Sequence, residues 1–124
     1  MVDQKTPVVH NWARIEREEL APGIARRYMY GDNIMVAQIL LDKDAVVPKH
    51  AHMNEQISNV ISGRLEFRFG EDGSDIRVAG AGETVVIPGH LPHEVVALED
   101  AVAVDLFSPP RQDWIDGTDD YFRD

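Results

Sequence analysis

Short apolar stretches separated by turn residues constrain the fold of this chain more than any other feature of its sequence. About nine or ten such stretches recur, with a turn roughly every eight to twelve residues, and none has the period of a long amphipathic helix. In Arg64 to Phe69, for example, Leu65, Phe67 and Phe69 alternate with charged residues, as on a strand with one buried face. The pattern predicts an all-β fold, either a double-sheet jelly roll or a small barrel.

The chain length suits a single domain over residues 1–124, with a polar C-terminal tail that begins near residue 112 and packs its apolar residues back on the barrel. Near the N-terminus we expect a short strand at Val8 to Trp12 and a helical turn at Ile15 to Leu20. We interpret Arg26 and Arg27 as a solvated strand edge. The main strands are expected over residues 24–30, 34–41, 56–61, 64–69, 76–78, 83–87, 93–97 and 101–107.

A histidine pair, His50 and His52, is the strongest candidate for chemistry. On an extended segment side chains alternate between faces, so both imidazoles and the amide of Gln56 would point the same way. Two imidazoles and an amide oxygen suit a metal, and His93 is the best candidate for the fourth ligand. Because the chain has no cysteine, any metal must be held by nitrogen and oxygen.

Two other residues compete for places in this site. Glu55 carries a negative charge, but strand alternation would turn it to the opposite face from His52. His90 lies in the same loop as His93, and we interpret it as a residue of the rim. The simpler alternative for the whole set is a few partly exposed histidines at the mouth of a barrel.

The spacing of these residues resembles the two sequence motifs of the cupin superfamily. In the first, a glycine precedes a His-x-His pair, then come an acid and a closing glycine; the second is Gly-x5-Pro-x-Gly-x2-His-x3-Asn. The matching positions are His50, His52, Gly63, Gly82, Pro88 and His93. Departures are Asp44 and His90 for glycine, Gln56 for the acid and Ala97 for asparagine. The resemblance implies a jelly-roll barrel, the double-stranded β-helix of the cupins.

Gln56 in place of an acid changes the charge of the site. With His50, His52, Gln56 and His93 as ligands, every ligand is neutral, and a divalent ion would keep its full charge. Such an ion is a stronger Lewis acid and attracts anionic oxygen, including a substrate carboxylate. We expect one divalent ion, with Ni, Zn, Mn and Fe all open.

A second set of candidate residues lies on the expected strand 101–107. Ala101, Ala103, Asp105 and Phe107 share one face, which is poor core filling and suitable cavity lining. Burial of Asp105 is costly unless the carboxyl is paired or protonated. One alternative is a structural ion pair between Asp105 and Arg111.

The run from Asp105 to Arg111, followed by Trp114, resembles a narrower group, the pectin-degradation (KdgF-type) cupins. Those proteins open 4,5-unsaturated uronates into linear keto-uronates and use a His, His, Gln, His metal site. The resemblance implies that Asp105, Phe107 and Arg111 are catalytic. Arg111 would bind a substrate carboxylate, Phe107 would face the sugar ring, and Asp105 would move a proton or orient water.

Two other functions stay open, because a cupin fold alone does not determine chemistry. The same ligands with iron would suit an oxygen-dependent dioxygenase that acts on a small organic substrate. A non-enzymatic cupin that binds a sugar or effector would use the metal only structurally, or not at all.

The formal net charge of −10 argues against nucleic acid and anionic membrane surfaces as partners. It also gives an anionic sugar no long-range attraction, so binding would depend on the metal and Arg111. No stretch is apolar enough to span a bilayer and no secretory leader is evident, so we expect a cytoplasmic protein. The cupin resemblance adds the expectation of a homodimer, with Val8 to Trp12 as a candidate exchanged edge.

Overall fold

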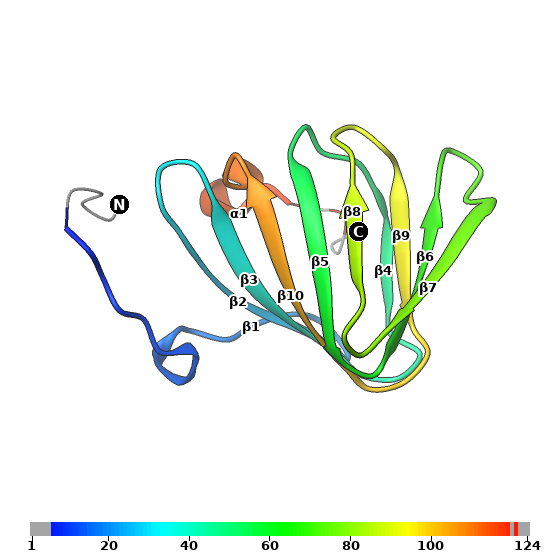
Figure 1. Cartoon of the computed structure of the whole chain (residues 1–124), viewed down its shortest axis with the longest axis horizontal. Coiled ribbons are helices and arrows are strands. Elements are labelled where there is room, and N and C mark those ends of the chain that lie inside the picture. The colour runs from blue at the N-terminus through cyan, green and yellow to red at the C-terminus, as the bar shows by residue number, and fades with distance from the viewer. Residues whose placement is uncertain (1–5, 120, 122–124) are drawn as a thin grey trace.

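The computed structural model describes residues 6–119 and 121 and consists almost entirely of antiparallel strands (Figure 1). A 3₁₀ helix precedes the strands and a short α-helix follows them. The elements are η1 (Trp12–Arg14), β1 (Glu18–Ala21), β2 (Ile24–Tyr30), β3 (Met35–Leu41), β4 (Val46–His50), β5 (Glu55–Ser62), β6 (Arg64–Phe69), β7 (Asp75–Gly80), β8 (Thr84–Ile87), β9 (His93–Ala97), β10 (Ala101–Ser108) and α1 (Gln112–Asp116). Neither helix in this part of the chain is long and apolar enough to cross a membrane.

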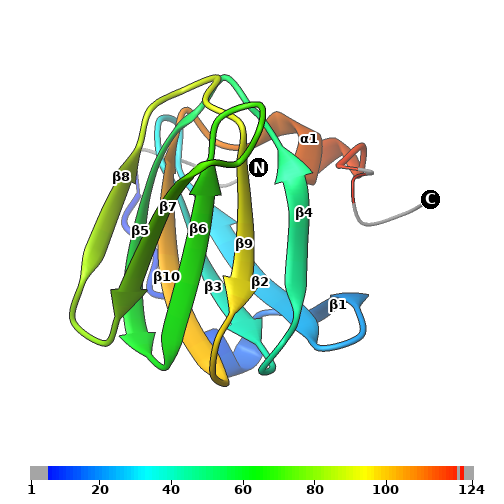
Figure 2. The same ribbon diagram turned by 90° about the vertical axis from the view of Figure 1, so that its right-hand side faces the viewer.

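Two sheets enclose the interior. The larger sheet has the strand order β1-β2-β3-β10-β5-β8, and the smaller one has the order β4-β9-β6-β7. Figure 2 shows β6, β9 and β4 of the smaller sheet in front of β10, β3 and β2 of the larger one. This architecture confirms the predicted all-β jelly roll. Among the described residues, no β-ladder joins the two sheets, neither between β4 and β1 or β2 nor between β7 and β8.

Alternating side chains fill the space between the sheets. Along β10, the predicted face of Ala101, Ala103, Asp105 and Phe107 is buried, while the residues between them are only half-buried. Large apolar residues of the other strands surround this face, among them Leu41, Val60, Leu65, Phe67, Ile87 and Val95. The two alanines fill less volume than the side chains opposite, which leaves room for a cavity beside Asp105.

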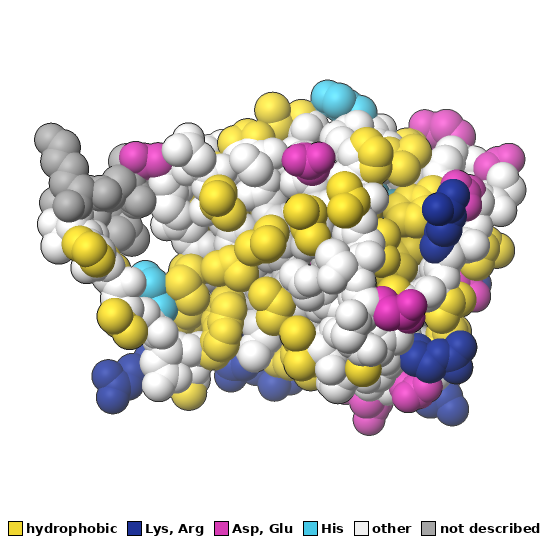
Figure 3. All heavy atoms as spheres, in the orientation of Figure 1, with side chains coloured by type: hydrophobic (Ala, Val, Ile, Leu, Met, Phe, Trp, Pro, Cys, Tyr) yellow, Lys and Arg dark blue, Asp and Glu magenta, His cyan; other side chains and the backbone are white. Residues whose placement is uncertain are grey.

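The outer face of the larger sheet is also rich in apolar side chains. Figure 3 shows them gathered over β3, β10 and β5. Ile61 of β5 and Val86 of β8 are exposed, and Val9, in the extended arm before η1, has 98% of its surface exposed. This face is therefore more apolar than the surface of a highly charged chain would suggest.

The N-terminal region differs from the prediction. Val8 to Trp12 forms no strand; η1 begins at Trp12, and the side chain of Asn11 caps it by accepting a hydrogen bond from the Ala13 backbone N–H at 2.9 Å. The helical turn expected at Ile15 to Leu20 is also wrong, because Glu18–Ala21 is strand β1. Pairing with β2 gives these backbone groups partners that an isolated helical turn would lack.

Arg26 is not the solvated edge residue that the sequence suggested. Its side chain is buried, and its guanidinium donates hydrogen bonds to Asp119 at 2.7 Å and to Glu18 at 3.1 Å. Its Cζ atom also lies 4.1 Å from the centroid of the Trp114 ring. These anionic and aromatic partners offset the cost of burying the charge.

Two residues that replace motif glycines adopt the left-handed backbone conformation that glycine tolerates best. Asp44 has a φ of 74° and His90 a φ of 67°. Gly63 retains the motif residue at a φ of 79°, and here a Cβ atom would lie only 2.8 Å from the Cα of Ala101. These three motif positions thus have a positive φ here, whether or not the residue is glycine.

Candidate metal centre

Three imidazoles meet at one end of the barrel interior. His50 ends β4 and is the register partner of His93, which begins β9, while His52 lies in the loop between β4 and β5. Their candidate ligand atoms all lie within 4.8 Å of one another. The loop, and not the strand alternation expected from the sequence, brings His52 to the cluster. Strand β4 ends at His50 and β5 begins only at Glu55.

Local backbone carbonyls orient all three rings. Each Nδ1 is hydrogen-bonded to a carbonyl oxygen two residues away: His50 to Pro48 (2.8 Å), His52 to Asn54 (3.1 Å) and His93 to Leu91 (2.9 Å). Since a carbonyl only accepts, each Nδ1 carries the proton and each neutral ring keeps its lone pair on Nε2. Histidines that bind metals are held by their second nitrogen in this way.

Burial lowers the pKa of each imidazole. The pKa of His50 falls to about 3, mainly through burial and then through the neighbouring His93. The pKa of His52 falls to about 4, through burial and then the charge of Arg111, and burial also lowers the pKa of His93. All three rings are therefore neutral near pH 7, which is the form that binds a metal ion.

Gln56 connects this cluster to Asp105. The amide Nε2 of Gln56 donates to Asp105 Oδ2 at 3.1 Å, which turns its Oε1 towards His52 Nε2, also at 3.1 Å. Both of those facing atoms bear lone pairs when His52 is neutral, so a cation between them would relieve their repulsion. Glu55, the rival candidate, is exposed, whereas Gln56 is buried.

The histidines also fit a metal by another criterion. The Nε2 atom of His93 is buried and has no hydrogen-bond partner among the described residues. A buried polar atom without a partner is costly, and a metal ion would supply the missing interaction. The structure therefore contains a possible three-histidine metal site, with the oxygen of Gln56 beside it.

Asp105 lies deeper in the same cavity. Its side chain accepts hydrogen bonds from Ser58 Oγ at 2.6 Å and from Gln56 Nε2. Burial raises its pKa to about 6, although both hydrogen bonds and the charge of Arg111 oppose the rise. A carboxyl group with such a pKa exchanges its proton readily near neutral pH.

Arg111 forms its ion pair with Asp113, and not with Asp105 as one interpretation of the sequence suggested. Its Nε and Nη2 atoms donate to the two carboxylate oxygens of Asp113 at 2.9 and 2.7 Å, and no ion pair joins it to Asp105 among the described residues. Its Cζ lies 5.1 Å from the Phe107 ring centroid and 4.9 Å from that of Trp114. The guanidinium is thus fixed between an acid and two aromatic rings.

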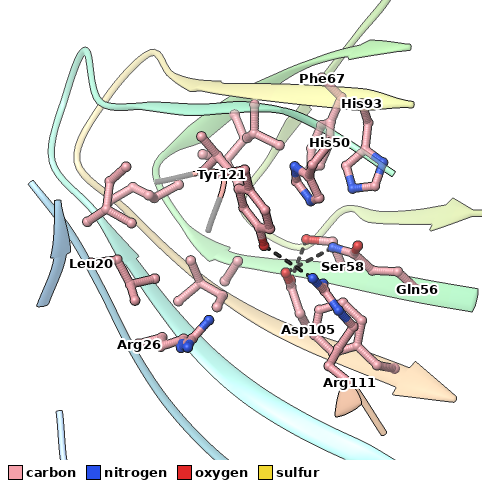
Figure 4. A pocket seen from close by; sticks show the side chains of 18 of the residues that line it. Leu20, Arg26, His50, Gln56, Ser58, Phe67, His93, Asp105, Arg111 and Tyr121 are labelled. Atoms are coloured by element: carbon pink, nitrogen blue, oxygen red, sulfur yellow. Dashed lines mark hydrogen bonds between the residues drawn. The ribbon is translucent and has the colours of Figure 1, made fainter. Parts of the chain in front are cut away.

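A cavity of about 60 Å³ brings both sets of residues together (Figure 4). His50, His93, Gln56, Asp105, Phe107 and Arg111 line it, as do Ser58, Arg26 and Tyr121. His52 instead lines an open groove of about 630 Å³ on the outside, together with Tyr30, Asn54 and Asp113. His90 is exposed in the loop before β9.

The family of the chain follows from comparison with known proteins. Residues 38–108 match the Cupin domain family. This chain is a cupin. The comparison with curated protein sequences found no match.

Solved cupin structures resemble this one over most of its length. KdgF from Halomonas sp. is 30% identical, with 88% of this chain and 99% of that chain covered and a TM-score of 0.80. An RmlC-like cupin from Shewanella frigidimarina is 29% identical, with coverages of 88% and 96% and a TM-score of 0.78. Oxalate decarboxylase from Bacillus subtilis is 21% identical and has a TM-score of 0.69; this chain covers 30% of it, so the likeness concerns the fold alone.

Sequence reasoning missed several residues of the cupin's cavity. Ser58 gave no signal apart from its place two residues after Gln56 on a strand, which puts both on one face. Asp113, two residues after Arg111, was a detectable local partner. Tyr121 belongs to the tail whose apolar residues were expected to pack on the barrel, and nothing near it in the sequence indicates that it meets His50.

Proposed function

We propose that this cupin binds one divalent metal ion through His50, His52, Gln56 and His93 and opens 4,5-unsaturated uronates to linear keto-uronates. The observation that carries the proposal is the hydrogen bond from Gln56 to Asp105, which joins a neutral metal-ligand set to a carboxyl of raised pKa. The structural similarity to KdgF from Halomonas sp. supports it. When bound, the ion would act as a Lewis acid towards a substrate oxygen.

The reaction adds water and needs no electron donor or acceptor. The π bond between C4 and C5 breaks as C4 takes a proton and C5 takes a hydroxyl group. The hemiketal formed at C5 then transfers its hydroxyl proton to the ring oxygen, the C5–O ring bond breaks, and a linear C5 ketone remains. The former ring oxygen stays on C1 as a second hydroxyl, and this hydrated aldehyde releases one water. A protein therefore has to place a proton donor and a water molecule on the ring.

The residues of the cavity suit these tasks. Protonated Asp105 delivers the proton to C4 and afterwards recovers one from water, which its pKa of about 6 permits near neutral pH. Arg111 binds the substrate carboxylate, and the bidentate pair with Asp113 keeps its guanidinium plane fixed. Phe107, buried beside Arg111 and 5.7 Å from His52 between ring centroids, offers an apolar face to the sugar ring.

Incubation with 4,5-unsaturated galacturonate tests the proposal directly. The ultraviolet absorbance of the enol ether should fall faster with metal-loaded protein than by spontaneous decay. A rate equal to spontaneous decay would remove the proposal. Oxygen uptake with a small organic substrate would instead favour the dioxygenase alternative, which uses the same histidines.

We also propose that the protein is a cytoplasmic homodimer. The apolar outer face of the larger sheet and the exposed arm with Val9 support pairing of two copies. Light scattering should give twice the mass of one 13.9 kDa chain, and a mass equal to one chain at micromolar concentration would contradict the dimer.

A further inference from the structure

Asp119 and Tyr121, which follow α1, each contact a strand of a different sheet, and no β-ladder joins the two sheets among the described residues. Asp119 Oδ2 accepts a hydrogen bond from Arg26 of β2 at 2.7 Å, and both side chains are almost fully buried, with 0% and 1% exposed. Tyr121 contacts His50 of β4. Asp119 thus contacts the larger sheet and Tyr121 contacts the smaller one.

Tyr121 covers the two groups on which substrate binding depends. Its ring lies parallel to the His50 ring, with 4.2 Å between centroids and an interplanar angle of 1°. Its hydroxyl accepts a hydrogen bond from Arg111 Nη2 at 3.2 Å. Figure 4 shows the ring beside His50, with the hydroxyl directed towards Asp105 and Arg111.

The cavity that remains is too small for a sugar. Its volume of about 60 Å³ holds a few water molecules, whereas pockets for small ligands have volumes of roughly 300 Å³ or more. A uronate ring therefore cannot reach Asp105 while Tyr121 occupies this position. Either the segment moves or no substrate enters.

We propose that Asp119 and Tyr121 form a gate over the metal centre, in which the Arg26–Asp119 ion pair is the latch and the Tyr121 ring is the cover. The inference rests on the proposed function for the size of the ligand. On opening, the carboxylate of the substrate takes the place of the Tyr121 hydroxyl on Arg111, and its ring takes the place of the phenol. The substrate thus binds by replacing the contacts that Tyr121 makes in the closed state.

The latch has features that permit opening. Arg26 keeps an ionic partner when Asp119 leaves, because Glu18 also accepts from it at 3.1 Å, and its stacking on Trp114 is independent of Asp119. In the closed state the second carboxylate oxygen of Asp119 is buried without a hydrogen bond from any described residue. The closed state is thus held by an ion pair that is strong but incompletely satisfied.

Chemical labelling of the metal-free protein tests the gate without any substrate. Diethyl pyrocarbonate modifies accessible neutral imidazoles, and mass spectrometry of peptides gives the rate at each histidine. His50 lies under Tyr121, His52 faces the outer groove and serves as a reference within the site, and exposed His10 serves as a distant reference. The variants are Asp119→Asn, Tyr121→Ala and Tyr121→Phe, with exposed Asp116→Asn as the matched control.

Release of the latch or removal of the cover should raise the labelling of His50 relative to His10 by roughly tenfold in Asp119→Asn and Tyr121→Ala. His52 should be unchanged, and Asp116→Asn and Tyr121→Phe should behave as the wild type, since the phenylalanine keeps the ring over His50. Equal His50 labelling in all variants would overturn the gate, and so would a rise that His52 shares. Because no uronate is present, failure of the turnover assay would leave this result intact.

Discussion

The amide nitrogen of Gln56 donates to Asp105 at 3.1 Å and thereby determines which way the rest of the amide points. With Nε2 committed to the carboxylate, the only group left for the histidine cluster is the oxygen Oε1. The proposed metal ligand and the proposed proton donor are therefore coupled through one side chain. A glutamate here would change both at once, which makes this position the most informative one to alter.

Gln56→Glu should raise the pKa of Asp105 and extend turnover to higher pH, because Asp105 donates its proton only in the protonated form. Two carboxylates about 3 Å apart disfavour simultaneous ionisation, so one of them keeps its proton to higher pH. The pH–rate profile for 4,5-unsaturated galacturonate should shift upwards by roughly one pH unit or more. Exposed Gln112→Glu adds the same charge and should leave the profile in place. An unshifted profile in Gln56→Glu would disprove the coupling.

Asp105→Asn should lower turnover by a large factor without loss of the metal. Loss of a positioned proton donor costs roughly 10²- to 10⁴-fold in rate, and asparagine keeps the size of the side chain. Initial rates and metal content should be measured on the same sample. Exposed Asp75→Asn, which removes only a surface pair with Arg77, is the control. Full activity in Asp105→Asn would rule out its role in proton transfer.

His50→Ala and His93→Ala should each lose the bound metal, because each removes one of three converging imidazoles. Elemental analysis of purified protein should show a stoichiometry well below one ion per chain. His90→Ala, which alters an exposed loop residue, should retain the wild-type content. If the stoichiometry of His50→Ala and His93→Ala is unchanged, the ligand assignment is wrong.

The metal-free protein should lose stability as the pH falls from about 6.5 to 4. The pKa values of His50 and His52 are about 3 and 4 in the folded state, below the ordinary value of 6.5. Over this range the unfolded chain binds protons that the folded chain does not, at about 1.4 kcal/mol per pH unit for each such group. Asp105 acts in the opposite direction, because its folded pKa of about 6 exceeds its unfolded value.

Urea unfolding of metal-free protein at a series of pH values measures this dependence. Asp105→Asn removes the opposing contribution, so its stability should fall more steeply with decreasing pH than that of the wild type. His10→Gln, which alters an exposed imidazole, should leave the slope unchanged. A stability that is flat between pH 6.5 and 4 would contradict the neutral state of the buried histidines.

Gly63→Ala should destabilise the fold far more than Gly82→Ala. Both glycines have positive φ angles, so both substitutions carry the backbone strain of about 1 kcal/mol. Only at Gly63 would the new Cβ crowd the backbone of Ala101, whereas the space around Gly82 is open. Thermal unfolding of both variants isolates the steric cost, and equal melting temperatures would show that the β5–β6 turn adapts.

The sequence predicted well those elements whose pattern is local. The bounds of β2, β6 and β9 agree with the expected strands, because alternation along a strand is visible within a few residues. The histidine cluster was predictable for a different reason, since the spacing of the cupin motifs encodes the turn geometry. Asp44 and His90 agree with this, as each stands at a glycine position of the motifs and has the positive φ that glycine tolerates best.

Long-range partners were not predictable from one sequence. The burial of Arg26 depends on Asp119, 93 positions away, and no feature near either residue indicates the pairing. The contact between Tyr121 and His50 likewise joins residues far apart in the sequence. The helical turn expected before β1 failed similarly, because pairing with β2 outweighed the local preference of a charged segment.

Each imidazole of the cluster is anchored by a carbonyl only two residues away. Three short stretches of backbone therefore orient the candidate ligands, and a bound ion is not needed to orient them. The metal-free protein would keep the same arrangement of histidines, and several divalent ions would fit it. Which ion occupies the site would then be decided largely by what the cell supplies, and a change of supply would change reactivity while the protein keeps its shape.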